Sequence, residues 1–309
     1  MNTPPRIVAF NPTTSHKVVL LELNPQFSEL RFARVDEISW TNSAGVESKA
    51  GLYYPIDFVP GRQYPLVIQT HDWRRDRFFI DGPFSTAFAA QPLAGTNIFV
   101  LQLNELISDE SPKEVDANIE LFEDGIEYLD NLGLIDRDRV GIVAFSYTCL
   151  HVEYALTHSK LHFAAASITD GIDAGYWQYL GAINSSPLFA HQYEIANGGV
   201  PFGPGLSSWL ARSPSFAIDK VTTPVRLTAL NGQSLLFEWE WFAALTRLNK
   251  PVELIYIDDG IHELQRPWDR MISQQGTVDW FTFWLKGEED PDPHKEDQYL
   301  RWKQMRRQH

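Results

Sequence analysis

The fold of this chain is decided by residues 140–148, which read V-G-I-V-A-F-S-Y-T. An apolar strand here runs through a tight turn into a helix, with Ser146 at the turn. This is the context of a strand–turn–helix nucleophile on the pattern G-x-S-x-G, whose flanking positions must be small so that strand and helix can approach. Ala144 meets that condition, whereas Thr148 is bulkier than the usual glycine. The motif predicts a nucleophile at Ser146, with a helix N-cap serine as the alternative.

Strand and helix patterns alternate on both sides of this stretch. Apolar helical stripes and buried-strand runs follow one another, which predicts an α/β fold with a mostly parallel central sheet and helices on both faces. The predicted strands are residues 6–10, 17–23, 46–54, 64–70, 97–103, 140–144, 161–168, 224–230 and 252–257, and the predicted helices are 111–133, 147–159, 235–249 and 271–285.

The predicted domains follow from one long connection. The main α/β domain spans residues 35–287, and its segment 169–222 is far longer than the usual connection of about 2–6 residues. This aromatic-rich segment is either a structural excursion with its own small core or, as we favour, a cap that lines a substrate cleft. Residues 1–34 form a β-strand appendage, and residues 288–309 a charged tail read as a solvated helix.

Composition narrows the function classes. The chain has 309 residues with 26 Lys and Arg against 40 Asp and Glu, a net charge of −14. This acidity argues against nucleic-acid and membrane-surface partners and, if part of it faces the cleft, against acidic substrates. The single cysteine, Cys149, excludes a cysteine-rich metal site, and no other metal or cofactor motif is present. With no signal peptide recognised, a cytoplasmic location is favoured, and the oligomeric state is left open.

A histidine follows the last predicted strand of the sheet. His262 lies in the loop after residues 252–257, at the carboxyl edge, and the usual order for this type of site is Ser, acid, His. Imidazole at this place takes the hydroxyl proton and returns it to the leaving group. The alternative is a solvated loop histidine. The order of Ser146 and His262 favours the general base.

More than one residue could supply the acid that orients the histidine. The loop at 231–236, which usually supplies a carboxylate, reads N-G-Q-S-L-L. Asp170, at the end of the preceding strand, and Glu238, in the following helix, rank equally, with Glu240 behind them. A dyad in which Ser234 or a backbone carbonyl orients the histidine remains open. The predicted oxyanion donors are the backbone N–H of Tyr147 and the loop that begins at His71.

At this point the chain resembles the catalytic α/β-hydrolase domain of the prolyl oligopeptidase family, from about residue 36 to residue 287, and the resemblance implies the α/β-hydrolase fold. It is most similar to the bacterial dipeptidyl aminopeptidases, acylaminoacyl-peptidases and lasso-peptide isopeptidases. The resemblance is carried by residues 64–71 (Y-P-L-V-I-Q-T-H), the turn around Ser146, Tyr193-Glu194, residues 197–203 (N-G-G-V-P-F-G), residues 250–254 (K-P-V-E-L) and residues 274–281 (Q-Q-G-T-V-D-W-F).

The resemblance implies a serine nucleophile at Ser146, a base at His262 and an oxyanion donor near His71. It also implies that the substrate region includes Glu194 and the glycine-rich stretch after it. The predicted substrate-binding residues are therefore Glu194, Tyr193, Trp177 and Phe202.

Three positions depart from the family's pattern. Asp72-Trp73 replaces the glycines after His71, and Thr148 replaces the glycine of the turn. Ser234 stands about where isopeptidase relatives carry the catalytic Glu, which weighs against a normal triad and against isopeptidase activity. Residues 6–32 look like the last strands of the family's β-propeller, which indicates a fragment or a propeller-free hydrolase.

These observations predict a serine hydrolase, and most of all a peptidase that cleaves peptide or amide bonds through an acyl-enzyme without a cofactor or metal. Its substrate is a peptide or a small ester or amide. One alternative is a carboxylesterase on the same Ser-His machinery. The other is a catalytically impaired binding domain, which the missing acid at Ser234 favours.

Overall fold

The central element is a mixed sheet that confirms the predicted α/β-hydrolase fold. The computed structural model describes residues 1–42, 45–105 and 111–308. Within these residues the eight-stranded sheet has the order β10-β9-β8-β7-β5-β6-β4-β3. Neighbours from β10 to β6 run parallel, and β4 and β3 are antiparallel. The strands are β3 (Val35–Thr41), β4 (Glu47–Tyr53), β5 (Tyr64–Gln69), β6 (Phe99–Leu103), β7 (Ile135–Phe145), β8 (Ala165–Thr169), β9 (Val225–Ala229) and β10 (Val252–Tyr256).

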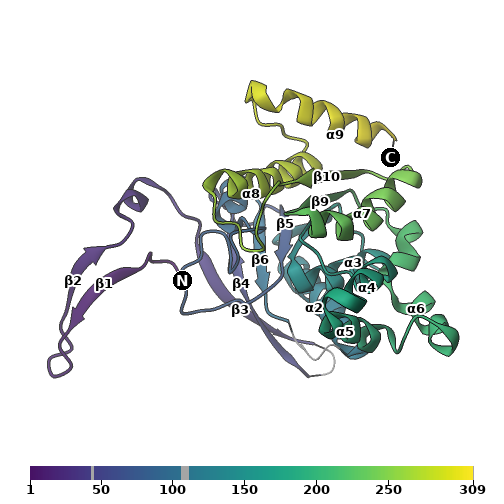
Figure 1. Cartoon of the computed structure of the whole chain (residues 1–309). Coiled ribbons are helices and arrows are strands. Elements are labelled where there is room, and N and C mark those ends of the chain that lie inside the picture. Colours follow the sequence, from purple (N-terminus) through teal and green to yellow (C-terminus); the bar gives the residue numbers. More distant parts are fainter. Residues whose placement is uncertain (43–44, 106–110, 309) are drawn as a thin grey trace.

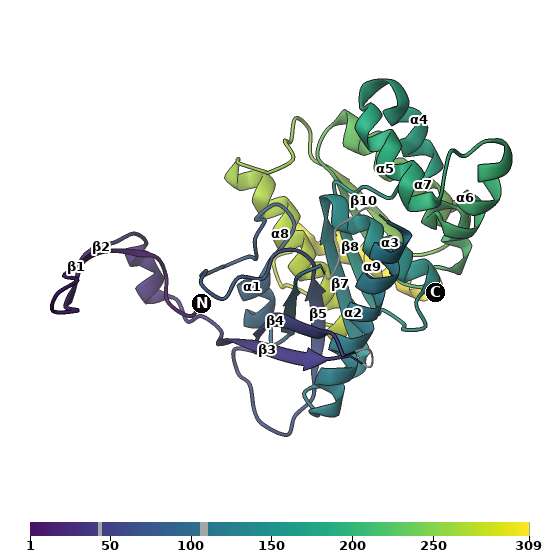
Figure 2. The same ribbon diagram turned by 90° about the horizontal axis from the view of Figure 1, so that it is seen from below.

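Helices cover both faces of the sheet (Figures 1 and 2). Alternate residues of β7 pack on opposite faces, as expected for a strand buried on both sides. Ile142 and Ala144 belong to one core cluster, and Val143 and Phe145 to the other. The first cluster includes residues of α2 (Pro112–Asn131), α3 (Cys149–His158) and α7 (Gly232–Arg247), and the second includes residues of α1 (Ala90–Gly95) and α8 (Pro267–Phe281).

The sequence patterns miss β3 and α1, and β7 begins at Ile135 rather than at residue 140. The early part of β7 is half-exposed and charged, so no apolar run marks it. Ile135 nevertheless pairs with Tyr64 of β5, and the register shifts before Leu66 pairs with Val140. The backbone partner, rather than the side-chain pattern, extends this strand.

The long connection between β8 and β9 is helical. It contains α4 (Tyr176–Ser185), α5 (Pro187–Asn197) and α6 (Leu206–Arg212), which lie together at one end of the sheet (Figure 2). Trp209 is fully buried, and Tyr179 packs edge-on against it at a centroid distance of 5.2 Å. The insertion therefore has an aromatic core of its own.

The N-terminal residues form the two predicted strands. β1 (Arg6–Phe10) and β2 (Lys17–Glu22) pair only with each other and project from the body (Figure 1). Every residue of both strands is exposed, including apolar ones such as Leu20 and Leu21.

Among the described residues, no helix combines the length and the apolar character needed to cross a membrane.

The C-terminal helix corrects one expectation. α9 (Glu296–Gln308) is helical as predicted, but it is not solvated on all sides, because Tyr299 and Trp302 are buried. The Trp302 ring packs edge-on against Trp280 of α8 at 5.1 Å, and its Nε1 donates to the Glu253 carboxylate at 2.9 Å. Two aromatic residues in a short charged segment do not form an apolar stripe, so the sequence pattern did not predict the buried face of α9.

Truncation of the Trp302 side chain tests whether α9 packs on the body. We expect Trp302→Ala to lower the free energy of unfolding by about 3–5 kcal/mol, because a fully buried indole leaves a cavity. The matched control, Leu300→Ala, changes an exposed residue of the same helix and should cost far less. Urea unfolding measures both, and equal effects would mean that α9 does not pack on the body.

Candidate active site

Ser146 is held in a strained turn at the carboxyl end of β7. The strand ends at Phe145, and a short helical turn over Ser146–Thr148 leads into α3. Ser146 has a φ of +56°, in the left-handed region that residues with a Cβ rarely adopt. Its carbonyl accepts the N–H of Ile172 at 3.2 Å, which ties the turn to the segment after β8. Strain of this kind is retained where the surroundings over-determine it, commonly at functional sites.

Thr148, which replaces the usual glycine, is bonded back into the same turn. Its side chain is fully buried. The Oγ1 hydroxyl donates to the Phe145 carbonyl at 2.9 Å. It also lies 2.6 Å from Oγ1 of Thr70, the residue directly after β5. The larger residue is therefore accommodated, and it cross-links the turn to the end of β5.

His262 is bonded to a carboxylate from another strand end. Its Nδ1 lies 2.5 Å from Oδ2 of Asp170, the residue directly after β8. Asp170 has a φ of +50°, and its N–H donates to Thr228 of β9 at 2.9 Å, so its backbone is fixed by the sheet. Of the two acids that ranked equally in the sequence, the structure brings Asp170 to the histidine.

The loop that carries His262 is fixed by contacts that the sequence did not reveal. The Thr86 hydroxyl donates to the His262 carbonyl at 3.1 Å and accepts the N–H of Leu264 at 2.9 Å. The His262 ring also stacks on Phe145, with centroids 4.6 Å apart and planes at 25°. Thr86 lies far upstream in an irregular segment, and no motif marks it.

Glu238 occupies a different place, beneath the Asp170 loop. Its side chain is buried, and Oε1 accepts the N–H of Gly171 at 2.6 Å. Burial raises the pKa of this carboxyl well above its usual value, and the nearby charge of Asp170 raises it further. Glu238 therefore supports the loop that carries Asp170.

The two other candidates of the sequence analysis are Glu240 and Ser234. Burial raises the pKa of Glu240. The Ser234 hydroxyl accepts the N–H of Leu230 at 3.1 Å.

Ser146, Asp170 and His262 line one pocket of about 310 Å³. Apolar side chains from the insertion and from α7 form part of its wall, and two amide side chains lie beside them. The remaining lining residues are Gly171, Ile172, Phe189, Asn231, Gln233, Ser234 and Phe237.

The four predicted substrate-binding residues are not among those that line this pocket. Tyr193 is buried, and its hydroxyl donates to Gln178 Oε1 at 3.0 Å. The Glu194 carboxylate accepts the Tyr179 hydroxyl at 2.9 Å. Both side chains connect α4 with α5, so their contacts are internal to the insertion.

Trp177 and Phe202 are half-exposed residues of the same insertion. The Trp177 indole donates to the Leu236 carbonyl at 2.9 Å, which joins α4 to α7. The sequence patterns singled out neither Phe189 nor Phe237, which both line the pocket wall. The helical register that turns these two toward Ser146 is set by the packing of the insertion. Substrate binding by the four predicted residues stays a prediction.

One predicted oxyanion donor belongs to the turn, and the other lies in a loop that is bonded to it. Tyr147 follows Ser146 directly, in the first helical turn. His71 follows β5 with a φ of +72°, and its ring is bonded to the turn, with Nε2 2.8 Å from the Phe145 carbonyl. The next residue, Asp72, also has a positive φ, and Trp73 is buried against Gly51.

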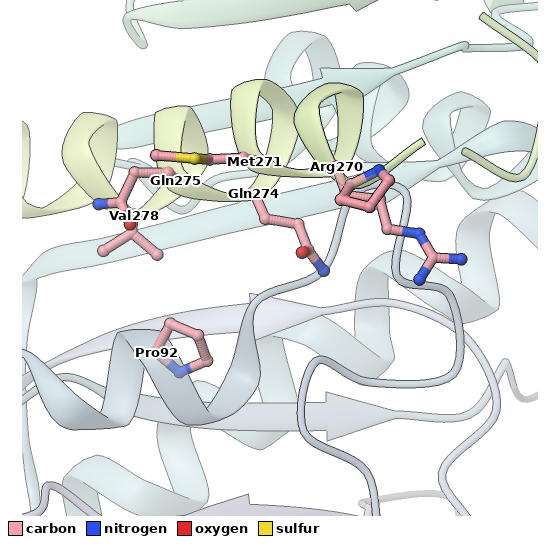
Figure 3. A pocket seen from close by; sticks show the side chains of 7 residues that line it. Pro92, Arg270, Met271, Gln274, Gln275 and Val278 are labelled. Atoms are coloured by element: carbon pink, nitrogen blue, oxygen red, sulfur yellow. The ribbon is translucent and has the colours of Figure 1, made fainter. Parts of the chain in front are cut away.

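A second hollow lies between α1 and α8 (Figure 3). Its wall combines apolar groups with glutamine amides and one guanidinium, and it includes none of the predicted site residues. The lining residues are Pro92, Pro267, Arg270, Met271, Gln274, Gln275 and Val278.

The chain is similar over nearly its whole length to a lasso peptide isopeptidase, AtxE2 of Asticcacaulis excentricus. The identity is 28% over an alignment of 323 positions, gaps included, which covers 98% of this chain and 45% of that protein. A solved structure of AtxE2 superposes with a TM-score of 0.83, covering 98% of this chain and 48% of the other. The resemblance to the prolyl oligopeptidase family is confirmed.

More distant structures share the fold. An acylaminoacyl peptidase of Pyrococcus horikoshii has 19% identity and a TM-score of 0.67, covering 91% of this chain and 46% of its own. A Mycobacterium tuberculosis puromycin-hydrolyzing peptidase has 18% identity and a TM-score of 0.71, covering 93% and 45%. The chain thus spans about half the length of these relatives. No protein-family model matches it.

The threonine in the turn gives a test of this geometry. We expect Thr148→Val to destabilise the fold by about 1–3 kcal/mol, because valine keeps the shape but leaves the partners of Oγ1 unsatisfied in a buried place. Thr222→Val removes an exposed hydroxyl and is the matched control. Denaturant unfolding reports both, and an unchanged stability in Thr148→Val would contradict the cross-link.

Proposed function

We propose that this chain is the catalytic part of a serine peptidase that cleaves peptide or amide bonds through an acyl-enzyme. The observation that carries the proposal is the shared pocket of Ser146, His262 and Asp170, with the imidazole bonded to the carboxylate at 2.5 Å. Nucleophile, base and orienting acid are the parts that acyl transfer requires, whatever their order in the chain.

In this mechanism His262 removes the proton of the Ser146 hydroxyl as the oxygen attacks the substrate carbonyl. Because Asp170 binds Nδ1, the second ring nitrogen, Nε2, is the one that exchanges the proton. The negative oxygen of the tetrahedral intermediate is stabilised by the Tyr147 N–H and by the loop that begins at His71. His262 then protonates the leaving amine, and water releases the acyl group by the reverse sequence.

The pocket wall indicates the substrate. Ile172, Phe189 and Phe237 offer apolar surface, and Asp170 is the only carboxylate among the lining residues. A peptide with an apolar side chain beside the scissile bond fits this wall. Because Ile172 and Phe189 come from the insertion 169–222, we propose that this segment acts as a cap over the substrate.

The relatives support a peptide as substrate. A serine-to-alanine variant of AtxE2 has been solved with Astexin3-dC4 bound, at 27% identity and a TM-score of 0.83. We propose that this chain likewise acts on a peptide, and that an isopeptide bond is one bond within its range. The Asp170–His262 contact supports this extension, because it supplies a carboxylate that is absent at Ser234.

The acid assignment has a direct test. We expect Asp170→Asn to lower kcat by about 10⁴, the size of acid-to-amide changes in other triads. Glu238→Gln should leave kcat nearly unchanged, because glutamine still accepts the Gly171 N–H from the same place. Steady-state turnover on a peptide anilide measures both. The reverse ranking would move the acid to Glu238, and two unaffected variants would favour a dyad.

The bond type has a separate test. We expect the chain to hydrolyse a peptide anilide that has an apolar residue before the scissile bond. Hydrolysis of the same anilide with an acidic residue at that place should be slower, and Ser146→Ala should abolish both. A p-nitrophenyl ester and an isopeptide-linked ring peptide are assayed in parallel. Turnover of the ester alone would favour the carboxylesterase alternative, and no turnover of any substrate would favour a binding domain.

A further inference from the structure

The protonation of His71 is constrained by the chemistry of its two partners. Nε2 lies 2.8 Å from the Phe145 carbonyl oxygen, and Nδ1 lies 3.0 Å from Oε1 of Glu105. A carbonyl and an ionised carboxylate accept hydrogen bonds but donate none, and a neutral imidazole carries one N–H only. The two contacts together therefore need an additional proton, on His71 or on Glu105.

The surroundings of the pair favour the ionised form of Glu105. Burial alone would raise the pKa of Glu105, but its hydrogen bond to His71 and the charge of that ring hold the pKa below its usual value. A lowered pKa favours the ionised form of Glu105, so this carboxylate is an acceptor for His71. The ion pair is largely shielded from solvent, with side-chain exposures of 16% for His71 and 20% for Glu105, so bulk water screens it only in part.

Within the described residues, a second histidine lies close to this pair. His151 of α3 lines the same narrow gap as His71 and Glu105, and its Nε2 lies 2.8 Å from Glu114 of α2. Any positive charge on His151 also favours the ionised form of Glu105. In the described part of the chain, the aromatic neighbours of the His71 ring are the uncharged Phe84, Phe88 and Phe145.

The backbone of His71 is fixed without help from Glu105. The Gln102 side chain donates to the His71 carbonyl and, at 2.7 Å, to the Thr70 carbonyl. These bonds hold the positive φ of His71 and the start of its loop. A change at Glu105 is therefore expected to alter the charge of the ring while leaving its place in the fold.

We propose that Glu105 is a positioning residue that keeps His71 doubly protonated, so that an imidazolium holds the Phe145 carbonyl beside the nucleophile. The effect on rate rests on the proposed function. In this arrangement the proposed positive charge is bonded to the carbonyl of Phe145, the residue before Ser146, and pre-placed charge near the negative oxygen of the tetrahedral intermediate lowers the barrier. The strained turn is also held by a charge-assisted hydrogen bond, which is stronger than a neutral one.

The variant Glu105→Gln separates charge from structure. A glutamine amide donates to an unprotonated Nδ1, so a neutral His71 keeps both of its hydrogen bonds. Glu37→Gln is the matched control, because Glu37 accepts from Trp73 in the same loop but does not contact His71. Both proteins are expected to fold, which thermal unfolding and circular dichroism verify.

The first measurement is independent of activity. In protein labelled with ¹⁵N-histidine, with the His71 signals assigned by their loss in His71→Gln, we expect both ring nitrogens of wild type to be protonated at pH 8. In Glu105→Gln one of them should be unprotonated. One unprotonated ring nitrogen in wild type at pH 8 would overturn the proposal, even if the chain is an active hydrolase.

The second measurement is the pH dependence of turnover on the peptide anilide. We expect kcat of Glu105→Gln to approach that of wild type near pH 5.5, where an ordinary histidine is protonated, and to fall about tenfold below it at pH 8, with KM little changed. Glu37→Gln should match wild type throughout. A ratio that does not vary with pH would overturn the role of the charge.

Discussion

The proposed active site of this chain depends on the contact between His262 and Asp170, which joins the segments after β10 and β8 across β9. Neither residue reaches the other by local sequence. The sheet fixes the backbone of Asp170 through Thr228, and Thr86 fixes the loop of His262. The side chain of Phe145, from the strand that carries the nucleophile, packs against the imidazole. The pocket, the strained turn and the proposed chemistry all require this arrangement.

The buried carboxyls beneath the pocket give Asp170 a distinct role. Glu153, Asp173 and Glu238 are each buried, and burial raises the pKa of all three well above the usual value. A raised pKa favours the neutral form of a carboxyl, which does not compete for a cationic imidazole. Asp170, at the pocket wall, is the carboxylate that contacts Nδ1 of His262, and we propose that it orients the ring.

Much of the fold was predictable from residue patterns. The strand–turn–helix around Ser146, the alternation of strands and helices and the place of His262 after the last strand all rest on local sequence. The choice between Asp170 and Glu238 could not be made from local sequence, because it depends on which carboxylate faces the histidine and which is buried beneath the Asp170 loop. The wall residues Phe189 and Phe237 were missed for the same reason, since the packing of α4, α5 and α7 sets their direction. In α9, the charges that suggested a solvated tail lie around a buried Trp302.

The central claim is that Ser146 is a nucleophile activated by a histidine that Asp170 orients. A crystal structure of the chain after treatment with a fluorophosphonate tests it most directly. The account predicts phosphorus bonded to Ser146 Oγ, a phosphonyl oxygen within hydrogen-bond distance of the Tyr147 N–H, and His262 still paired with Asp170. An unmodified Ser146 in the treated crystal, or an imidazole paired with a different acid, would contradict it.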